Sequence, residues 1–467
     1  MSVKPVPAGG FVARVPVAIV GAGAAGLCAA LAAHEAGVET IVLERDAVPR
    51  GSTALSAGLI PAAGTRWQKA LGIADSPALF AADINDKSHG ESDAAIVDLV
   101  AREAGMTVEW LADRHGLPFL LVHGFDYPGH SARRMHGLPT RAGAELIDQL
   151  RDAAERAGTT IITDATVTSL YADGARAIHG VEITRPDRAR DSIGCQALVL
   201  ACSGYGGAAD IVARHIPEMR DATYFGHPGN RGDAVLWGEA LGAEIRYMSA
   251  YQGHGSVAHP HGVLITWAVI MEGGFQVNTE GRRFSDESRG YSEQAAVVLT
   301  QPGGIAFDIF DTHIATVARQ FEDFRQAEAC GAVIEAGTVA ELAERLSLAP
   351  SALAESFAEV EDAKRSGITD RFGRSFAGRK ALSPPFKAVK VTGALFHTQG
   401  GLAIDVSARV VGTRGEPLPN LFAAGGASAG VSGSRASGYL SGNGLLTATV
   451  LGRVAGQSAA ELVRRRE

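Results

Sequence analysis

VPVAIVGAGAAGLCAALAAHEAGVETIVLERD, residues 15–46, is the stretch that decides how this chain folds. The apolar run VAIV is typical of a buried parallel strand, and TIVLE predicts a second strand. Between them, GAGAAG has the GxGxxG spacing of a dinucleotide site. The order strand, glycine turn, helix, strand therefore predicts a Rossmann-like, doubly wound α/β domain that binds a dinucleotide.

The glycines and one acidic residue each have a physical role in such a site. Gly21 permits the tight turn, Gly23 lets the backbone approach a pyrophosphate, and Gly26 lets the helix lie close to the strand. The helix that follows turns its free N–H groups toward the phosphates. Glu44 ends the second strand and is placed to accept a hydrogen bond from a ribose hydroxyl. Because the motif lies near the N-terminus, FAD is favoured over NAD.

Length, charge and cysteine usage exclude several classes of protein. The 467 residues predict two or three domains, and the net charge of −8 argues against generic nucleic-acid binding. The four cysteines lack metal-ligand and disulfide spacing, so we expect no metal site. No apolar stretch is long enough to span a membrane and no apolar leader begins the chain, which predicts no membrane span and a cytoplasmic location. The sequence does not indicate an oligomeric state.

Four later segments place small residues and glycines beside expected strands or helices. They are RGSTALSAGLI (50–60), ALVLACSGYGG (197–207), NLFAAGGASAGVSG (420–433) and SGYLSGNGLLTATVLGRVAG (437–456). Their order resembles the fumarate reductase/3-ketosteroid dehydrogenase superfamily of flavoproteins, over nearly the whole chain. The resemblance implies FAD, with the last helix pointing its N-terminus at the isoalloxazine. N–H groups there would stabilise the negative charge of the reduced ring.

The resemblance also implies which residues contact the cofactor. Members that bind FAD covalently have a histidine in the segment matching 51–60, and this chain has none there, so we expect non-covalent FAD. The expected FAD-binding residues are Gly21, Gly23, Ala24, Ala25, Gly26, Glu44, Arg45, Ser52, Thr53, Ser56, Ala57, Gly58, Val167, Ala201, Gly204, Gly425, Gly426, Asn443, Gly444 and Leu445. No second nucleotide motif is evident, which leaves oxygen, a quinone and a carrier protein open as the electron acceptor.

The resemblance implies a chain divided into three parts. Residues 1–244 and 387–467 would form one discontinuous FAD-binding domain. Residues 245–386 would form an inserted α+β capping domain that closes over the substrate. We expect this insertion to begin with a loop rich in histidine and glycine, YQGHGSVAHPHG (251–262).

The superfamily divides into two branches by the group that activates the substrate. In both, a hydride moves between flavin N5 and the carbon β to that group, and a proton moves at the α carbon. VNTEGRRFSDES (277–288) matches a motif shared by both branches, in which Arg283 and Glu287 would form a buried ion pair. Four residues past Glu287, the dicarboxylate branch has a proton-delivering arginine. This chain has Tyr291 there, as the ketone branch does.

A second tyrosine supports the ketone branch. Tyr439 directly precedes the last helix and would donate a hydrogen bond to the substrate carbonyl, with the Ser441 hydroxyl and the Gly442 N–H as further donors. Tyr291 would then remove the α proton as a tyrosinate, once a nearby dipole or cation lowers its pKa from about 10. The alternative for both tyrosines is simple packing.

Other residues fit the dicarboxylate branch or the surface. His397 in FHTQGG matches a substrate-binding histidine of that branch, and Arg435 lies near its carboxylate-clamping arginine, although the spacing differs by several residues. An ordinary loop residue is the alternative for His397. Arg133, Arg134 and His136 are candidates for the pocket mouth, and solvated surface is the favoured interpretation for them.

These patterns predict an FAD-dependent dehydrogenase that desaturates the Cα–Cβ bond of a ketone, in a ring. The main alternative is an α,β-unsaturated carboxylate reductase or a dicarboxylate dehydrogenase. A non-catalytic flavin-binding or electron-transfer module is the third. A keto acid, with both a ketone and a carboxylate, would fit both sets of residues.

Overall fold

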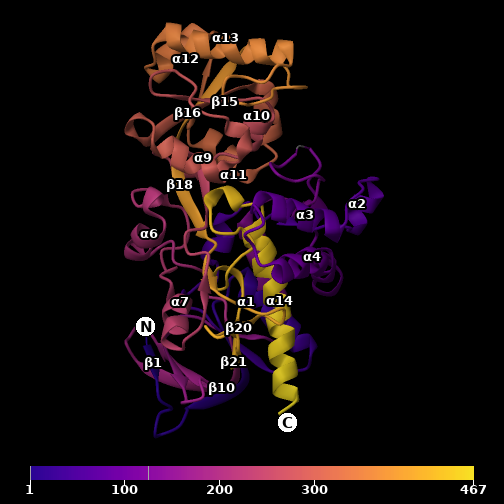
Figure 1. Ribbon diagram of the computed structural model, residues 1–467, viewed down its shortest axis with the longest axis vertical. Coiled ribbons are helices and arrows are strands. Elements are labelled where there is room, and N and C mark those ends of the chain that lie inside the picture. Colours follow the sequence, from indigo (N-terminus) through magenta and orange to yellow (C-terminus); the bar gives the residue numbers. More distant parts are fainter. Residues whose placement is uncertain (1, 125, 467) are drawn as a thin grey trace.

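The computed structural model describes residues 2–124 and 126–466. A large sheet with its helices forms one end of the elongated molecule, and a second sheet with its own helices forms the other (Figure 1). The predicted nucleotide-binding unit is present as β2 (Ala13–Val20), α1 (Ala24–Glu35) and β3 (Thr40–Leu43). β2 and β3 pair in parallel. The predicted doubly wound α/β fold with an inserted α+β part is confirmed.

The first sheet has nine strands, and its centre is parallel. Its strands besides β2 and β3 are β1 (Ser2–Lys4), β7 (Thr160–Ile162), β8 (Thr166–Ala172), β9 (Ile178–Thr184), β10 (Arg190–Leu200), β20 (Arg409–Val411) and β21 (Pro417–Ala423). β10 pairs in parallel with β2 on one side and with β21 on the other, while β8 and β9 form an antiparallel hairpin beside it.

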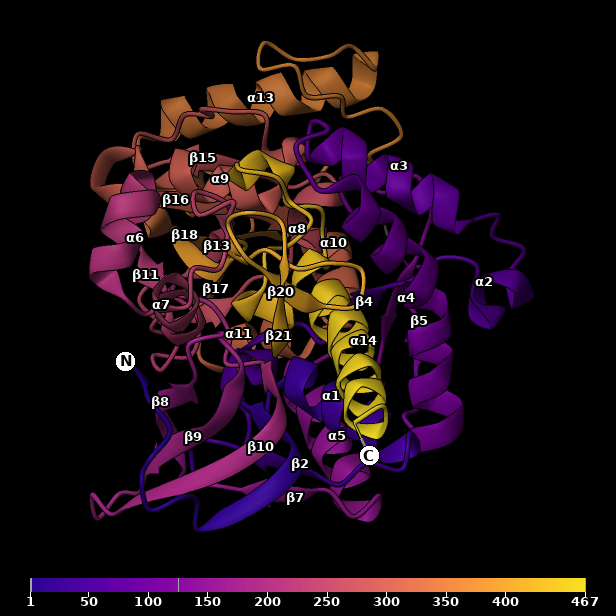
Figure 2. The same ribbon diagram turned by 60° about the horizontal axis from the view of Figure 1, so that its bottom comes forward.

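The last helix, α14 (Asn443–Arg464), lies directly against α1 (Figures 1 and 2). A Cβ added at Gly452 would lie 2.4 Å from the Ala25 carbonyl oxygen, and one at Gly456 would lie 2.1 Å from that of Ala29. Only glycine allows this approach, which joins the two ends of the chain in one layer.

Further helices and two small sheets surround this part. The helices are α2 (Arg66–Ala70), α3 (Pro77–Lys87), α4 (Ala94–His115), α5 (Gly143–Arg156), α6 (Ala209–His215) and α7 (Asp233–Ala240). The short strands are β4 (Ile60–Pro61), β5 (Leu120–Leu121), β6 (Met135–Gly137), β12 (Ile245–Arg246) and β19 (Gly401–Leu402). None of the helices within 2–124 and 126–466 is long and apolar enough to cross a membrane.

The second sheet has seven strands and is mostly antiparallel. Its strands are β11 (Thr223–Tyr224), β13 (Tyr251–Ala258), β14 (Val263–Leu264), β15 (Phe275–Asn278), β16 (Ile305–Asp311), β17 (Val333–Ala336) and β18 (Phe386–Thr398). Its helices are α8 (Ala268–Met271), α9 (Tyr291–Leu299), α10 (Thr312–Ala318), α11 (Glu322–Ala329), α12 (Val339–Leu346) and α13 (Pro350–Ser366).

Two separate hydrophobic cores correspond to these two parts. One core draws on residues 17–243 and 402–463, and the other on residues 258–391. β18 pairs with β13, β16 and β17, so the second sheet continues to Thr398, past the expected boundary at residue 386. We keep the three-part division as a proposal, with its second boundary moved to the end of β18.

The expected loop at 251–262 is wrong, because most of it is strand β13. Its glycines serve packing instead of flexibility. A Cβ at Gly253 would lie 2.6 Å from the Cβ of Ala295, and one at Gly255 would lie 2.8 Å from the Cβ of Gln294. The small residues of β13 therefore let α9, which carries Ala295 and Gln294, lie directly on the sheet.

Candidate active site

One large pocket is lined by residues of both parts, and most of the predicted site residues meet there. Those that line it are Gly21, Gly23, Ala24, Ala25, Glu44, Arg45, Ser52, Thr53, Ser56, Ala57, Gly58, Val167, Ala201, Tyr291, His397, Gly425, Gly426, Tyr439, Gly442, Gly444 and Leu445. The predicted residues that do not line it are Gly26, Gly204, Ser441 and Asn443.

The glycine turn shapes one end of this pocket. Gly21 has φ +101°, and a Cβ there would lie 2.6 Å from the Ala201 carbonyl oxygen. Gly23 precedes the first turn of α1 and supplies no capping side chain. Gly26 does not face the pocket, because a Cβ there would lie 1.9 Å from the Gly21 carbonyl oxygen. Its role is the close packing of helix and turn.

Glu44 and Arg45 line the pocket beyond the glycine turn. The Glu44 carboxylate is buried and accepts hydrogen bonds from the backbone N–H groups of Ala22, at 2.8 Å, and Asp46, at 3.0 Å. The Arg45 guanidinium pairs with Asp233 at 2.7 Å. Glu44 thus braces the turn and keeps accepting capacity for a ligand hydroxyl, and the charge of Arg45 is already matched.

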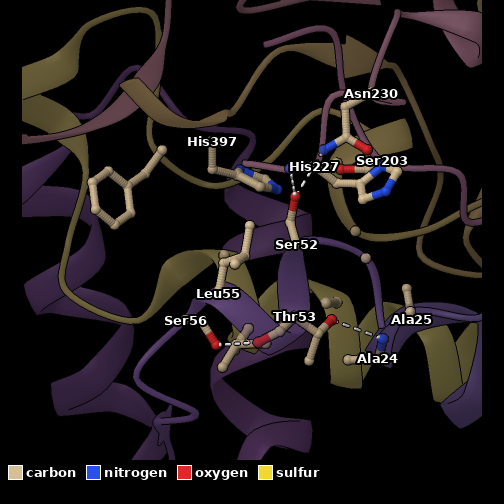
Figure 3. Close-up of a pocket in the computed structure, with 18 of the residues that line it drawn as sticks. Ala24, Ala25, Ser52, Thr53, Leu55, Ser56, Ser203, His227, Asn230 and His397 are labelled. Atoms are coloured by element: carbon tan, nitrogen blue, oxygen red, sulfur yellow. Dashed lines mark hydrogen bonds between the residues drawn. The ribbon is translucent and has the colours of Figure 1, made fainter. Parts of the chain in front are cut away.

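The small-residue segment forms a short 3-10 helix, Gly51–Leu55, along the pocket wall. The Thr53 hydroxyl accepts a hydrogen bond from the N–H of Ala24 at 3.1 Å, and the Ser52 hydroxyl accepts from Asn230 and from the His227 N–H (Figure 3). This segment is therefore fixed at both sides of the pocket.

The N-termini of α1 and α14 both lie at the pocket, and the residues there suit FAD. Gly442, which has φ +87°, precedes α14 and supplies no capping side chain, as Gly23 does at α1. Asn443 Oδ1 is buried and has no hydrogen-bond partner in the described chain. Two helix N-termini whose N-cap residues are glycines, at one pocket, suit the pyrophosphate and the isoalloxazine of a flavin dinucleotide.

The polar segment GRRFSDESRGY (281–291) holds Tyr291 in place. The predicted ion pair is present: Glu287 is fully buried and pairs with Arg283 at 3.0 Å and with Arg374 at 2.8 Å. Gly290 follows with φ +155°, where a Cβ would lie 2.3 Å from Glu293 Oε2. The chain can turn sharply there, and Tyr291 becomes the first residue of α9.

Tyr291 and Tyr439 meet with several hydrogen-bond donors. Their ring centroids are 6.1 Å apart, and both side chains are buried. Ser441, the Gly442 backbone and the Tyr439 hydroxyl lie near enough to the Tyr291 hydroxyl to lower its pKa. The Gly444 N–H donates to the Tyr439 oxygen at 3.2 Å. Ser441 faces this cluster from a small adjoining cavity instead of the main pocket.

The predicted lowering of the Tyr291 pKa is wrong. Burial raises the pKa of Tyr291 to about 12, because a phenolate is poorly solvated there, and nearby Glu293 acts in the same direction. The hydrogen bonds from Ser441, Gly442 and Tyr439 lower the pKa and offset part of this effect. Burial raises the pKa of Tyr439 as well. Both side chains are therefore phenols near neutral pH.

A half-buried histidine supports the loop that contacts Tyr291. His130 Nε2 donates to the Ser441 carbonyl oxygen at 2.9 Å, and Arg134 donates to its Nδ1. Burial, together with the charge of Arg134, lowers the pKa of His130 to about 4, so the ring is neutral. His130 is thus a positioning residue. No local motif in the sequence marks it.

Two more neutral histidines line the pocket. His254 stacks on Tyr291 with ring centroids 4.8 Å apart, and its Nδ1 accepts from the Ser256 N–H at 3.1 Å. The Nδ1 of His397 lies 2.8 Å from the Gln399 amide nitrogen. Burial lowers the pKa of His254 to about 3 and that of His397 to about 4. In these tautomers each Nε2 carries the proton and is a donor. The sequence pattern marked the segment around His254 only as a loop.

The arginines weighed for the pocket lie elsewhere. Arg435 is exposed and pairs with Glu91 at 3.0 Å, and Arg133 is exposed and pairs with Asp126. Solvated surface, the favoured interpretation, is wrong for Arg134 and His136. Both are buried: Arg134 pairs with Asp75 and Asp83, and His136 hydrogen-bonds the Thr65 hydroxyl.

Gly204 and Asn443 support the pocket from behind it. A Cβ at Gly204 would lie 2.0 Å from the Thr398 hydroxyl oxygen, and the Asn443 amide donates to the Ser432 hydroxyl at 3.1 Å. Their predicted direct contact with FAD stays a prediction. Within the described residues, no group of three or more histidine, cysteine or acidic side chains is placed to hold a metal ion.

Comparisons with known proteins agree with this geometry. The model of the FAD binding domain family matches residues 16–445. The probable fumarate reductase Ifc3 of Shewanella frigidimarina is 30% identical over 445 residues, which are 95% of this chain and 74% of that protein. The open conformation of a flavocytochrome c3 fumarate reductase is 30% identical, with a TM-score of 0.81 over 98% of this chain and 80% of that one. A 3-ketosteroid-Δ4-(5α)-dehydrogenase from Rhodococcus jostii RHA1 is 25% identical, with a TM-score of 0.75 over 98% and 99%.

Proposed function

The chain belongs to the FAD binding domain family and to the fumarate reductase-like flavoproteins, and from that premise we propose that it desaturates the Cα–Cβ bond of a cyclic ketone. The protein is an FAD-dependent oxidoreductase. Bound FAD supplies the acceptor for a hydride. The residues of this chain bind the ketone, orient it and hold the proton.

The tyrosine pair is the single observation that carries this proposal. Tyr439 and Gly442 lie beside Tyr291. With a ketone bound, the Tyr439 O–H and the Gly442 N–H would donate to its oxygen, and such donors stabilise the enolate that forms as the α proton leaves. The Gly444 N–H, by donating to the Tyr439 oxygen, polarises that phenol and strengthens it as a donor. Tyr291 lies beside Tyr439, and its phenolate form accepts the α proton from the substrate.

The raised pKa of Tyr291 makes the rates of desaturation and of its reverse reaction depend differently on pH. Removing a proton from the substrate needs the phenolate, a minor form at neutral pH because the pKa is about 12. Delivering a proton in the reverse reaction uses the phenol, which is the major form. Desaturation should therefore speed up as the pH rises, and saturation of the C=C bond should not.

The rest of the pocket suits an uncharged ring. Phe225 and Phe396 are stacked with ring centroids 4.6 Å apart, and both line the pocket together with Trp267 and Leu264. The one arginine among the described lining residues is Arg45, which already pairs with Asp233. A dicarboxylate would find no unpaired guanidinium there.

Reduction of an α,β-unsaturated carboxylate is the second candidate. His254 and His397 favour it, because both line the pocket. The Nδ1 of each ring is already hydrogen-bonded, so each neutral ring keeps its Nε2–H as a donor for a carboxylate. The relatives named fumarate reductases favour it too.

One experiment separates the two candidates. The FAD-loaded protein is mixed anaerobically with cyclic ketones, with succinate and, after chemical reduction, with fumarate and cyclic enones. Loss of flavin absorbance with the ketone and its return with the enone support ketone desaturation. Responses confined to succinate and fumarate support the second candidate. In that case a residue other than Arg45, which is already paired with Asp233, would have to deliver the proton to the α carbon.

A further inference from the structure

Asp323 is a carboxylate of the second part of the chain that lines the pocket and has no role in the chemistry above. It lies in the first turn of α11, where Phe324 and Ala327 are buried in the core beneath the helix. Phe321, just before the helix, is buried and lines the same pocket. The helix therefore anchors one face in the core and presents Asp323 to the pocket.

The carboxylates of the pocket differ in their partners. Glu44 accepts from the Ala22 N–H at 2.8 Å, and Asp46 pairs with His227 at 2.8 Å. For Asp323, the described part of the chain provides neither a hydrogen bond nor an ion pair. Asp323 is half-buried. Charges withdrawn from water are normally paired, so an unmatched carboxylate in a ligand pocket indicates that the ligand brings the partner.

The electrostatics around Asp323 agree with this geometry. Burial raises the pKa of Asp323 to about 6, and the negative charge of neighbouring Glu322 adds to the rise. No cation acts in the opposite direction. The side chain is still mostly ionised near neutral pH, so it leaves a negative charge at the pocket wall.

The surrounding wall strengthens this charge. Leu264, Trp267 and Phe321 line the same pocket as Asp323, and apolar walls exclude water and lower the local dielectric. Aromatic rings also attract cations through their faces. Folding has already removed part of the water from Asp323, so a bound cation gains attraction without that cost being added again.

We propose that Asp323 binds a positively charged ammonium group on the substrate, away from the two tyrosines, and excludes substrates that carry a carboxylate at that point. The inference rests on the proposed function, because it takes the ketone to lie at Tyr291 and Tyr439. It narrows the substrate to a cyclic ketone with a cationic substituent. A keto acid would bring a second negative charge to the same wall.

Calorimetric titration of the FAD-loaded protein under anaerobic conditions tests this inference. The probes are cyclohexanones substituted at C4. The substituent is a trimethylammoniomethyl group, its uncharged isostere neopentyl, or a carboxymethyl group. The same ammonium group on plain cyclohexane serves as a probe without a ketone. We expect the dissociation constant of the cationic ketone to be at least about tenfold lower than that of its uncharged isostere.

Two variants assign any preference to Asp323. Asp323→Asn keeps the size and should bring the ratio of the cationic to the neutral dissociation constant close to one. Asp323→Lys should reverse the order, so that the carboxymethyl ketone binds best. Glu322→Gln is the matched control, because Glu322 adjoins Asp323 but does not line the pocket. It should keep most of the preference.

The outcomes separate this inference from the proposed function. If ketones bleach the flavin but the cationic preference is absent, or survives Asp323→Asn, the inference is wrong and the proposed function stands. If the cationic probes bind through Asp323 but no ketone bleaches the flavin, the cation site at Asp323 stands and the ketone chemistry is wrong. If no probe binds, both are wrong.

Discussion

Tyr291→Phe removes one oxygen atom from the cluster of donors and leaves the ring in place. The ring packs against His254, with centroids 4.8 Å apart, and against Trp267, so we expect the pocket and its FAD to be retained. If Tyr291 holds the α proton, ketone desaturation should slow by about 10²–10⁴, the usual worth of a general base. The assay is anaerobic flavin reduction by a cyclic ketone, followed in stopped flow.

The pH profile gives this prediction a second, sharper readout. With a pKa of about 12, the phenolate fraction of Tyr291 is about 10⁻⁵ at pH 7 and grows tenfold with each pH unit. The kcat/KM of desaturation reports the ionisation of the free enzyme, so it should rise about a hundredfold from about pH 7 to pH 9. The Tyr291→Phe variant should lack this rise.

A matched control guards against a general effect of losing a buried phenol. Tyr205 is fully buried, hydrogen-bonds the Met248 carbonyl oxygen and does not line the pocket. Tyr205→Phe should leave the rate and its pH profile unchanged. Near wild-type flavin reduction by Tyr291→Phe, or a wild-type profile that is flat across this range, would refute the role given to Tyr291.

Three other expectations concern the cofactor and the stability of the second sheet. Glu44→Ala should weaken FAD binding by about 1.5–3 kcal/mol, because it removes an acceptor of charge-assisted hydrogen bonds. The variant should therefore lose FAD during dialysis, and full retention counts against the assignment. Acid precipitation should release all the flavin into the supernatant, whereas flavin left on the pellet would mean a covalent bond. Burial raises the pKa of Asp308 to about 7, so the folded state holds a proton that the unfolded state releases above about pH 4. The free energy of unfolding should therefore fall between about pH 4 and pH 7, and Asp308→Asn should flatten that fall in urea denaturation at several pH values; equal slopes in both proteins contradict this.

The nucleotide-binding unit could be predicted from sequence because its constraints are local. Gly21 and Gly26 contact each other within one turn, and a Cβ at Gly26 would lie 1.9 Å from the Gly21 carbonyl oxygen. Spacing alone therefore reports the geometry. The meeting of Tyr291 and Tyr439 is predicted by resemblance, because Tyr439 follows Tyr291 by 148 positions and no local rule brings them together.

Burial and pKa values could not be predicted in the same way. Arg134 is polar in sequence and resembles a surface residue, yet Asp75 and Asp83 from a different segment neutralise it in the interior. The pKa of Tyr291 depends on what encloses it, including Trp267 and His254, which come from other elements. Electrostatics of this kind depend on the assembled site and not on the neighbours in the chain.

Anaerobic flavin bleaching by an uncharged or cationic cyclic ketone, measured beside succinate on the same FAD-loaded protein, tests the ketone chemistry most sharply. We expect the ketone to bleach the flavin, Tyr291→Phe and Tyr439→Phe both to slow the bleaching by at least about 10², and succinate to leave the flavin oxidised. Bleaching by succinate with no response to any ketone would contradict the ketone chemistry.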